Sequence, residues 1–87
     1  MPAELRLLYF AWVRDKAGTG EERIAHPGVD CTIAMLLDRL AAASAPHATA
    51  FADRKRLRAA LDQAYVALDA PIGEAVELAI FPPVTGG

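Results

Sequence analysis

The chain has 87 residues, 54% of them hydrophobic, and a net charge of −2 at pH 7. This length predicts a single domain, and the apolar content argues against intrinsic disorder because it can bury enough surface to offset chain entropy. The acidic balance argues against a nucleic-acid partner, since nucleic-acid binders are usually basic.

Three further features of the composition concern where the protein works. No apolar run approaches the ~20 residues that span a membrane, and the N-terminal sequence lacks the basic start of a signal peptide. The one cysteine, Cys31, cannot form an internal disulfide, which fits a reducing compartment. We therefore expect a soluble cytoplasmic protein with no membrane partner.

The first half of the chain predicts two strands and one long helix. Residues 5–11 are rich in aliphatic and aromatic side chains and predict a strand, and residues 21–26 predict a second, shorter one. Thr32 is a good N-cap, and apolar residues recur after it at helical spacing. The helix should run over residues 33–44 and end before Pro46, because proline disfavours helical geometry in the residue that precedes it.

The second half predicts mainly strands. Residues 47–56 fit either a short second helix or an irregular loop. The strands expected after them are 57–61, 65–68 and 76–81, with a turn at Asp62 and Gln63 between the first two. With only one long helix, this order predicts an α+β fold in which the helix covers one face of a mixed sheet.

Alternation of side chains assigns the faces of the first and last strands. The sets expected to face the helix are Leu5, Leu7 and Tyr9 in the first strand and Val76, Leu78 and Ile80 in the last. Arg6 and Glu77 mark the opposite sets as outward, which leaves Leu8, Phe10 and Phe81 on the solvent side. Such an exposed apolar patch usually marks a partner surface. A curled sheet or a covering loop would instead bury these residues.

The chain ends in FPPVTGG, residues 81–87. Pro82 and Pro83 cannot continue a strand ladder on both sides, so they should direct the chain away from the sheet. The six residues 82–87 span at most about 20 Å when extended. Nothing apolar beyond Val84 offsets the entropy of holding them in place. We therefore expect a domain over residues 1–81 and a flexible tail over residues 82–87.

Gly86 and Gly87 suit a reactive tail. Without Cβ atoms they can pass through a narrow channel and present the terminal carboxyl carbon to an attacking group. A terminal carboxylate has a pKa of about 3.3–3.7, so at neutral pH it is an anion and a poor electrophile until a leaving group such as AMP replaces its oxygen. The alternative is an ordinary frayed terminus.

Three segments resemble a known family. They are FPPVTGG at residues 81–87, YFAWVRDKAG at residues 9–18, and RAALDQAYVALDAPIGEAVELAIFPP at residues 58–83. Together they are similar to the small subunits of molybdopterin synthase, which are sulfur carriers with the ubiquitin-like β-grasp fold. The family's aromatic-Ala-x-x-Arg pattern at the end of the first strand is met by Phe10, Ala11 and Arg14. Residues 42–55 match poorly, and Asp62 stands where the family usually has Asn.

The resemblance implies a route for sulfur. An adenylating enzyme of the ubiquitin-activating kind would condense the Gly87 carboxylate with ATP, and a persulfide donor would then supply the sulfur of a thiocarboxylate. The charged tail would enter the large subunit of a heterotetrameric synthase and donate sulfur to cyclic pyranopterin monophosphate. The chain itself would bind no cofactor, and its partner would hold the catalytic side chains. The residues expected to contact the partner are Phe10, Phe81, Pro82, Pro83, Val84, Thr85 and Gly86.

Other candidate groups predict less specific roles. The only basic run, residues 54–58 (RKRLR), is best explained as a solvated loop rather than a nucleic-acid site, and it could also orient an acidic partner. Cys31 lacks a basic neighbour closer than His26, which favours a structural role. His26 and His47 lack metal-ligand spacing, so we expect no metal site. Trp12 could extend the Phe10 patch or pack in the core.

Two alternative functions remain open from the residues. A carrier of the same chemistry could serve thiamin thiazole formation or transfer-RNA thiolation, whose carriers also end in Gly-Gly. A ubiquitin-like binding module of another class would keep the fold but leave Gly86 and Gly87 as a passive terminus.

Overall fold

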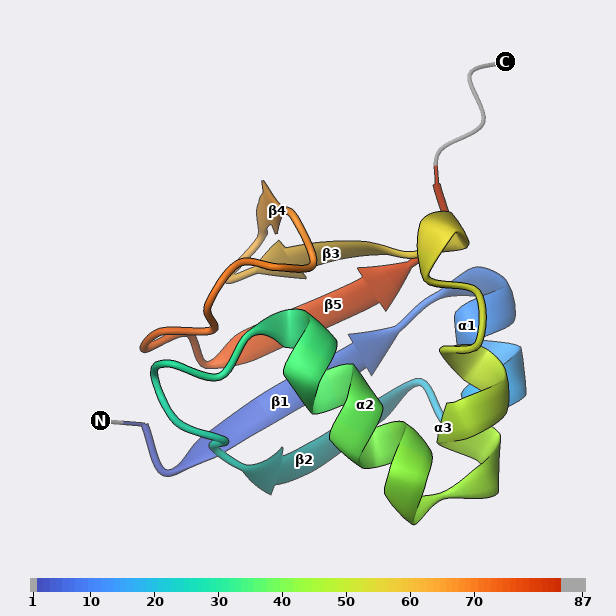
Figure 1. The fold of residues 1–87 in the computed structure, drawn as a ribbon, viewed down its shortest axis with the longest axis horizontal. Helices are drawn as coiled ribbons and strands as arrows, with labels where there is room; N and C mark the ends of the chain where they lie inside the picture. Colours follow the sequence, from blue (N-terminus) through green and yellow to red (C-terminus); the bar gives the residue numbers. More distant parts are fainter. Residues whose placement is uncertain (1, 84–87) are drawn as a thin grey trace.

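A computed structural model describes residues 2–83, which form five strands, three α-helices and one short 3₁₀ helix (Figure 1). In chain order these are β1 (Glu4–Tyr9), α1 (Ala11–Ala17), β2 (Glu21–Ala25), α2 (Ile33–Ala43), α3 (Ala45–Ala50), η1 (Arg54–Arg56), β3 (Arg58–Leu61), β4 (Ala64–Val66) and β5 (Glu77–Phe81). The strands make one sheet in the order β2-β1-β5-β3-β4. The central strands β1 and β5 run parallel, and the other pairs are antiparallel. The expected α+β fold with a mixed sheet is confirmed.

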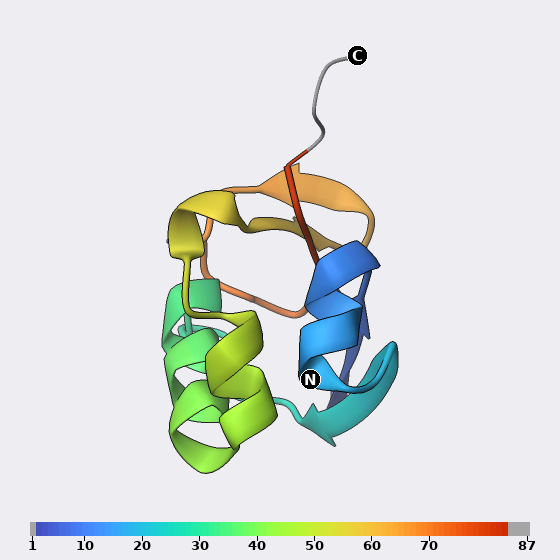
Figure 2. The same cartoon turned by 90° about the vertical axis from the view of Figure 1, so that its right-hand side faces the viewer.

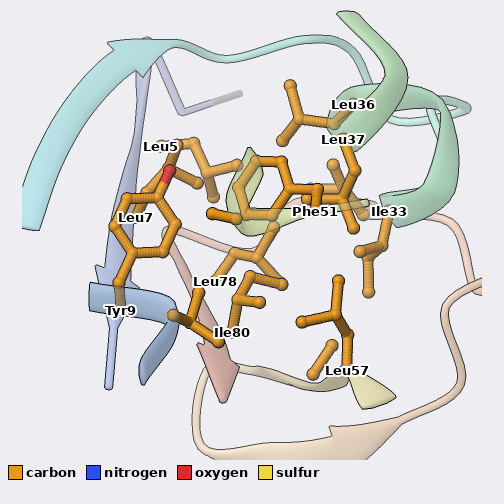
Figure 3. Close-up of a cluster of buried hydrophobic side chains, with 14 of the residues drawn as sticks. Leu5, Leu7, Tyr9, Ile33, Leu36, Leu37, Phe51, Leu57, Leu78 and Ile80 are labelled. Carbon is orange, nitrogen blue, oxygen red and sulfur yellow. The ribbon is translucent and has the colours of Figure 1, made fainter. Parts of the chain in front are cut away.

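The main helix α2 crosses one face of the sheet, which we call the inner face (Figure 1). Its apolar side chains Ile33, Leu36 and Leu37 meet those of the two central strands, as Figure 3 shows. The predicted inward set is buried as expected at Leu5, Leu7, Tyr9, Leu78 and Ile80. Alternation therefore orients both central strands correctly.

Val76 is an exception, because its side chain is 55% exposed and not buried. The residue lies one position before β5. There its backbone N–H donates to the Asp62 carboxylate, 3.0 Å away, rather than to a neighbouring strand. The alternation of the strand begins only at Glu77, so the prediction for Val76 was wrong.

The long helix α2 is the main helix that was expected, but the predicted end of the first strand at residue 11 was wrong, because β1 ends at Tyr9 and the short helix α1 follows. Phe10 is still extended, and Gly18 ends the helix in the left-handed region with φ 82°. Val13 and Ala17 lie one turn apart and are both buried. The i, i+4 spacing of these two residues before a glycine was the available signal. Parity counting along a strand therefore does not apply to Trp12, which packs partly buried against the core.

Residues 47–56, for which a short helix and an irregular loop were both considered, contain both: α3 covers Ala45–Ala50, and an irregular stretch follows it. The Ser44 hydroxyl accepts the backbone N–H of His47 and so caps α3, with Pro46 in the first turn of that helix. Proline is well tolerated there, because the first N–H groups of a helix have no partner within the helix. Pro46 therefore both prevents α2 from continuing and helps α3 to begin. The irregular stretch that follows α3 contains η1.

Among residues 2–83, no helix has the length and apolar character needed to cross a bilayer.

Helix α3 is fixed to the sheet by a cluster of rings. The Tyr9 ring lies 5.9 Å from that of Phe51 and 6.2 Å from that of His47, measured between centroids. His47 Nε2 lies 2.6 Å from a carboxylate oxygen of Glu22 on β2. The buried Tyr9 hydroxyl has no hydrogen-bond partner among the described residues. Burial, together with the nearby Glu22 carboxylate, raises the pKa of Tyr9 far above its usual range.

Replacing Tyr9 by phenylalanine is expected to raise the free energy of unfolding by about 1 kcal/mol at pH 7, because it removes a buried donor without a partner. Above pH 10 the advantage should grow by about 1.4 kcal/mol per pH unit. The tyrosine of the unfolded chain then loses its proton while native Tyr9 keeps it, so the wild type alone is destabilised as pH rises. Urea unfolding of both proteins between pH 7 and 11 measures this difference. A loss of stability in Tyr9→Phe at pH 7 would mean that the hydroxyl has a partner.

Candidate functional site

The face of the sheet opposite α2, the outer face, carries a groove of about 540 Å³. Apolar side chains from four strands and from Phe10 line it, and we call this set the apolar groove: Leu8, Phe10, Ala60, Tyr65, Ala79 and Phe81. Gln63 and Glu77 complete its lining. The predicted outward patch of Leu8, Phe10 and Phe81 is thus one continuous surface, and no loop of the described chain closes over it.

The strand register explains how these residues meet. Leu8 pairs with Ala79, Ala79 with Ala60, and Ala60 with Tyr65, so one row of side chains crosses β1, β5, β3 and β4. Side chains directly opposite one another in a sheet share a face. The two alanines in the middle of the row are small, which leaves a depression between the larger side chains on either side.

Phe10 owes its position to the end of β1. It keeps an extended backbone, with φ −128° and ψ 155°, and its N–H donates to the Ile80 carbonyl at 3.3 Å. The alternation of the strand therefore continues for one residue beyond Tyr9, and Phe10 points outward with 49% of its side chain exposed. The pattern of Phe10, Ala11 and Arg14 spans this strand end and the first turn of α1, rather than lying within a strand.

Tyr65 belongs to the apolar groove although the sequence did not place it there. Its side chain is 81% exposed, and its ring lies 5.6 Å from that of Phe81. The hairpin turn decides its face, because Asp62 and Gln63 have φ values of 47° and 72° and make a two-residue loop. Leu61 consequently pairs with Ala64, which places Tyr65 opposite Ala60 on the outer face. The short Asp-Gln turn was the signal that fixed this register.

The apolar groove reaches the point where the tail begins. Strand β5 ends at Phe81, as expected, and Pro82 and Pro83 follow it with half-buried side chains. The predicted tail residues Val84, Thr85, Gly86 and Gly87 lie outside the described residues.

The opposite end of the groove is polar. Arg6 lies opposite Glu77 across the parallel pair, and their side chains form an ion pair at 2.6 Å. Glu77 is itself buried. This pair limits the apolar part of the outer face to the half that lies next to the tail.

The remaining candidate groups have structural surroundings. Cys31 is buried, and its thiol donates to the Thr32 carbonyl at 3.4 Å. His26 accepts the Gly28 N–H at Nδ1, and its Nε2 lies 3.2 Å from the Ala75 carbonyl. Within residues 2–83, no three His, Cys, Asp or Glu side chains gather as metal ligands would.

Comparison with known proteins agrees with this architecture. The ThiS family matches residues 7–87. The molybdopterin synthase sulfur carrier subunit of Escherichia coli K12 is 40% identical over 83 residues, which cover 95% of this chain and 99% of that protein.

Two solved structures share the fold over nearly the whole chain. The small archaeal modifier protein 1 of H. volcanii is 25% identical with a TM-score of 0.70, over 95% of this chain and 100% of that one. A Pyrococcus furiosus protein assigned as subunit 1 of a molybdopterin converting factor has a TM-score of 0.71 at 24% identity, over 95% and 100% of the two chains.

These findings define the class of the protein. The mixed five-stranded sheet with α2 across one face is a ubiquitin-like β-grasp fold. The chain belongs to the ThiS family.

Proposed function

We propose that this chain is the sulfur carrier subunit of a molybdopterin synthase. The observation that carries the proposal is the apolar groove, which lies on the outer face and ends at Phe81, where the chain runs into Pro82, Pro83 and the terminal Gly-Gly. The relationship to the Escherichia coli sulfur carrier subunit, over nearly the full length of both chains, supports the same assignment.

The proposed chemistry takes place on the terminal carboxylate of Gly87. An adenylating enzyme of the ubiquitin-activating kind joins this carboxylate to AMP from ATP and releases pyrophosphate. The terminal sulfur of a persulfide donor then attacks the acyl carbon and expels AMP, which leaves an acyl disulfide. A second thiol of the donor cleaves this S–S bond and is itself oxidised to a disulfide, so that the chain ends as a thiocarboxylate. The domain itself binds no cofactor in this scheme, since ATP is consumed in the active site of the activating enzyme.

The apolar groove is the docking surface in the proposed mechanism. It seats the large synthase subunit against Phe10 and Phe81, so that residues 82–87 enter the active site of that subunit. The thiocarboxylate then supplies sulfur for the dithiolene of molybdopterin, made from cyclic pyranopterin monophosphate. Two copies of each subunit would form the heterotetramer. The cytoplasm, which supplies ATP and reduced thiols, is the proposed location.

The mass of the intact protein tests this function. After incubation with ATP, the activating enzyme and a persulfide donor, the chain should be heavier by one oxygen-to-sulfur exchange. Fragmentation should place the change on Gly87, and omission of ATP should prevent it, because the ionised carboxylate is not displaced without activation.

Cys31 provides the control for this experiment. Cys31→Ala should still acquire the full mass change, since the thiol is buried and has no part in the proposed route. A persulfide on Cys31 would also add sulfur, but without ATP and with a different mass increment. Sulfur on Cys31, or sulfur acquired without ATP, would contradict the proposal and favour a binding module with a passive terminus.

A further inference from the structure

The basic run at residues 54–58 lies beside the end of β5, where the tail begins (Figure 1). Its members differ in their surroundings. The Arg54 guanidinium is bound within the domain: its Nε donates to the Phe51 carbonyl at 2.7 Å, and its Nη2 forms an ion pair with the Asp38 carboxylate at 2.9 Å. Lys55, Arg56 and Arg58 are exposed, and none of them forms an ion pair within residues 2–83.

Arg58 connects this run to the apolar groove. It lies directly opposite Phe81 in the β3–β5 pair, and with Tyr65 and Phe81 it lines a second hollow of about 250 Å³. Its Nη1 donates to the Lys55 and Leu57 carbonyls at 3.0 and 2.8 Å, which hold the guanidinium in place. A fixed cation thus stands next to the last aromatic residue before the tail.

Helix α1 adds a cation near the same end of the sheet. The Trp12 ring carries the Lys16 ammonium at 5.3 Å and the Arg56 guanidinium at 5.4 Å, so α1 and η1 are joined through this ring. Figure 2 shows the turn of η1 and helix α1 on either side of the strand end that leads to the tail. We call Lys16, Lys55, Arg56 and Arg58 the basic collar.

The basic collar is unusual for a chain whose net charge is −2. Asp15 and Asp53 are its nearest acidic neighbours in sequence, and they leave an excess of positive charge. Nucleic acid is a poor occupant, because the chain as a whole is acidic and the Trp12 ring within the collar is already covered by two cations. A folded surface that presents carboxylates matches both the charge and the exposure of these side chains.

We propose that the basic collar receives an acidic rim on the large synthase subunit, formed by aspartate and glutamate side chains around the opening that admits the tail. This inference rests on the proposed function and specifies the chemistry of that partner. Exposed charges act over about 10 Å at moderate salt, so the collar would orient the domain before the apolar groove makes contact. Its main effect falls on the association rate rather than on the lifetime of the complex.

Charge reversal at single positions tests the collar. Lys55→Glu and Arg58→Glu should each slow association with the large subunit about tenfold at low ionic strength, and the difference should vanish near 0.5 M salt, which is strongly screening. The dissociation rates should stay near that of the wild type. Stopped-flow or surface-binding kinetics over a salt series measure both constants. Arg39→Glu on α2 is the matched control, because it is exposed and makes the same change in net charge.

Each outcome has a definite meaning. If Lys55→Glu and Arg58→Glu both associate with the large subunit at the wild-type rate, the proposed role of the basic collar is wrong. If Arg39→Glu slows association equally, the effect comes from net charge alone. Binding of ATP by the free chain, lost in Lys55→Glu, would assign the cations to phosphate and also refute the acidic rim. If the wild type takes up sulfur on Gly87 and binds the large subunit while all variants behave alike, the inference fails and the proposed function stands.

Discussion

A chain that ends at Thr85 is expected to make no molybdopterin and yet to melt as the full chain does. The buried residues of the described domain lie between Leu5 and Ile80. Glycine has no side chain to bury, so we expect the loss of the last two residues to leave this core unchanged. The melting temperature should change by less than about 4 °C, the shift that 1 kcal/mol would cause in a domain of this size. Product formation by the reconstituted synthase should be abolished, because the proposed sulfur donor is the thiocarboxylate formed at Gly87.

An added residue separates a carrier from a passive terminus more sharply than truncation does. One alanine placed after Gly87 should also abolish product formation, whereas one residue added before Met1 should have no effect. Circular dichroism and thermal melting of all three proteins monitor the fold. A drop in melting temperature well beyond 4 °C on truncation would mean that the tail is structural. Normal activity with the added alanine would remove Gly87 from the chemistry.

Phe81→Ala and Phe10→Ala are each expected to weaken binding of the large subunit by ~2 kcal/mol or more, which is roughly 30-fold in Kd. Aromatic side chains at the centre of an interface commonly contribute this much. The cost to folding should be smaller, because Phe10 is half exposed and Phe81 lies at the end of its strand. Titration calorimetry of the two subunits gives the affinity, and thermal melting gives the stability.

Met35→Ala is the control for these two variants. Met35 is 45% exposed, close to the 49% of Phe10, but it lies on α2, on the opposite side of the sheet. Its replacement should leave the affinity for the large subunit unchanged. Wild-type affinity in both phenylalanine variants would remove the apolar groove from the mechanism. A loss of affinity that follows the loss of stability would instead indicate a folding defect.

The orientation of the central strand β1 could be predicted from the sequence because its side chains alternate strictly between buried and more exposed. Leu5, Leu7 and Tyr9 face the core as the pattern predicts, and Phe10 is exposed on the other face. Helix α1 could not be found by the same reasoning, because apolar content alone does not distinguish a strand that continues from a chain that reverses. The reversal occurs at Ala11, which has φ 53°, a conformation that no local propensity of alanine predicts.

The residues of the candidate site could be predicted from the sequence only in part, because some of their positions depend on tertiary structure. Phe81 lies at the end of a strand that the sequence predicts clearly, so its position follows from that strand. Tyr65 depends on the register of a hairpin, and that register follows from a two-residue turn whose conformation had to be known. The basic run read as a single motif, yet Arg54 pairs with Asp38 on α2 while Arg58 lies beside Phe81. Tertiary contacts, which the sequence does not show, give these neighbouring residues different surroundings.

The central place of β5 has a consequence for how the protein is made. Until residues 77–81 insert between β1 and β3, the sheet exists only as two separate strand pairs, each with an unpaired edge. Synthesis runs from the N-terminus, so the ribosome delivers this strand after the other four. The apolar groove, which needs Ala79 and Phe81, therefore cannot exist before the strand that leads to the tail has been released. A nascent or truncated chain without β5 therefore lacks the apolar groove.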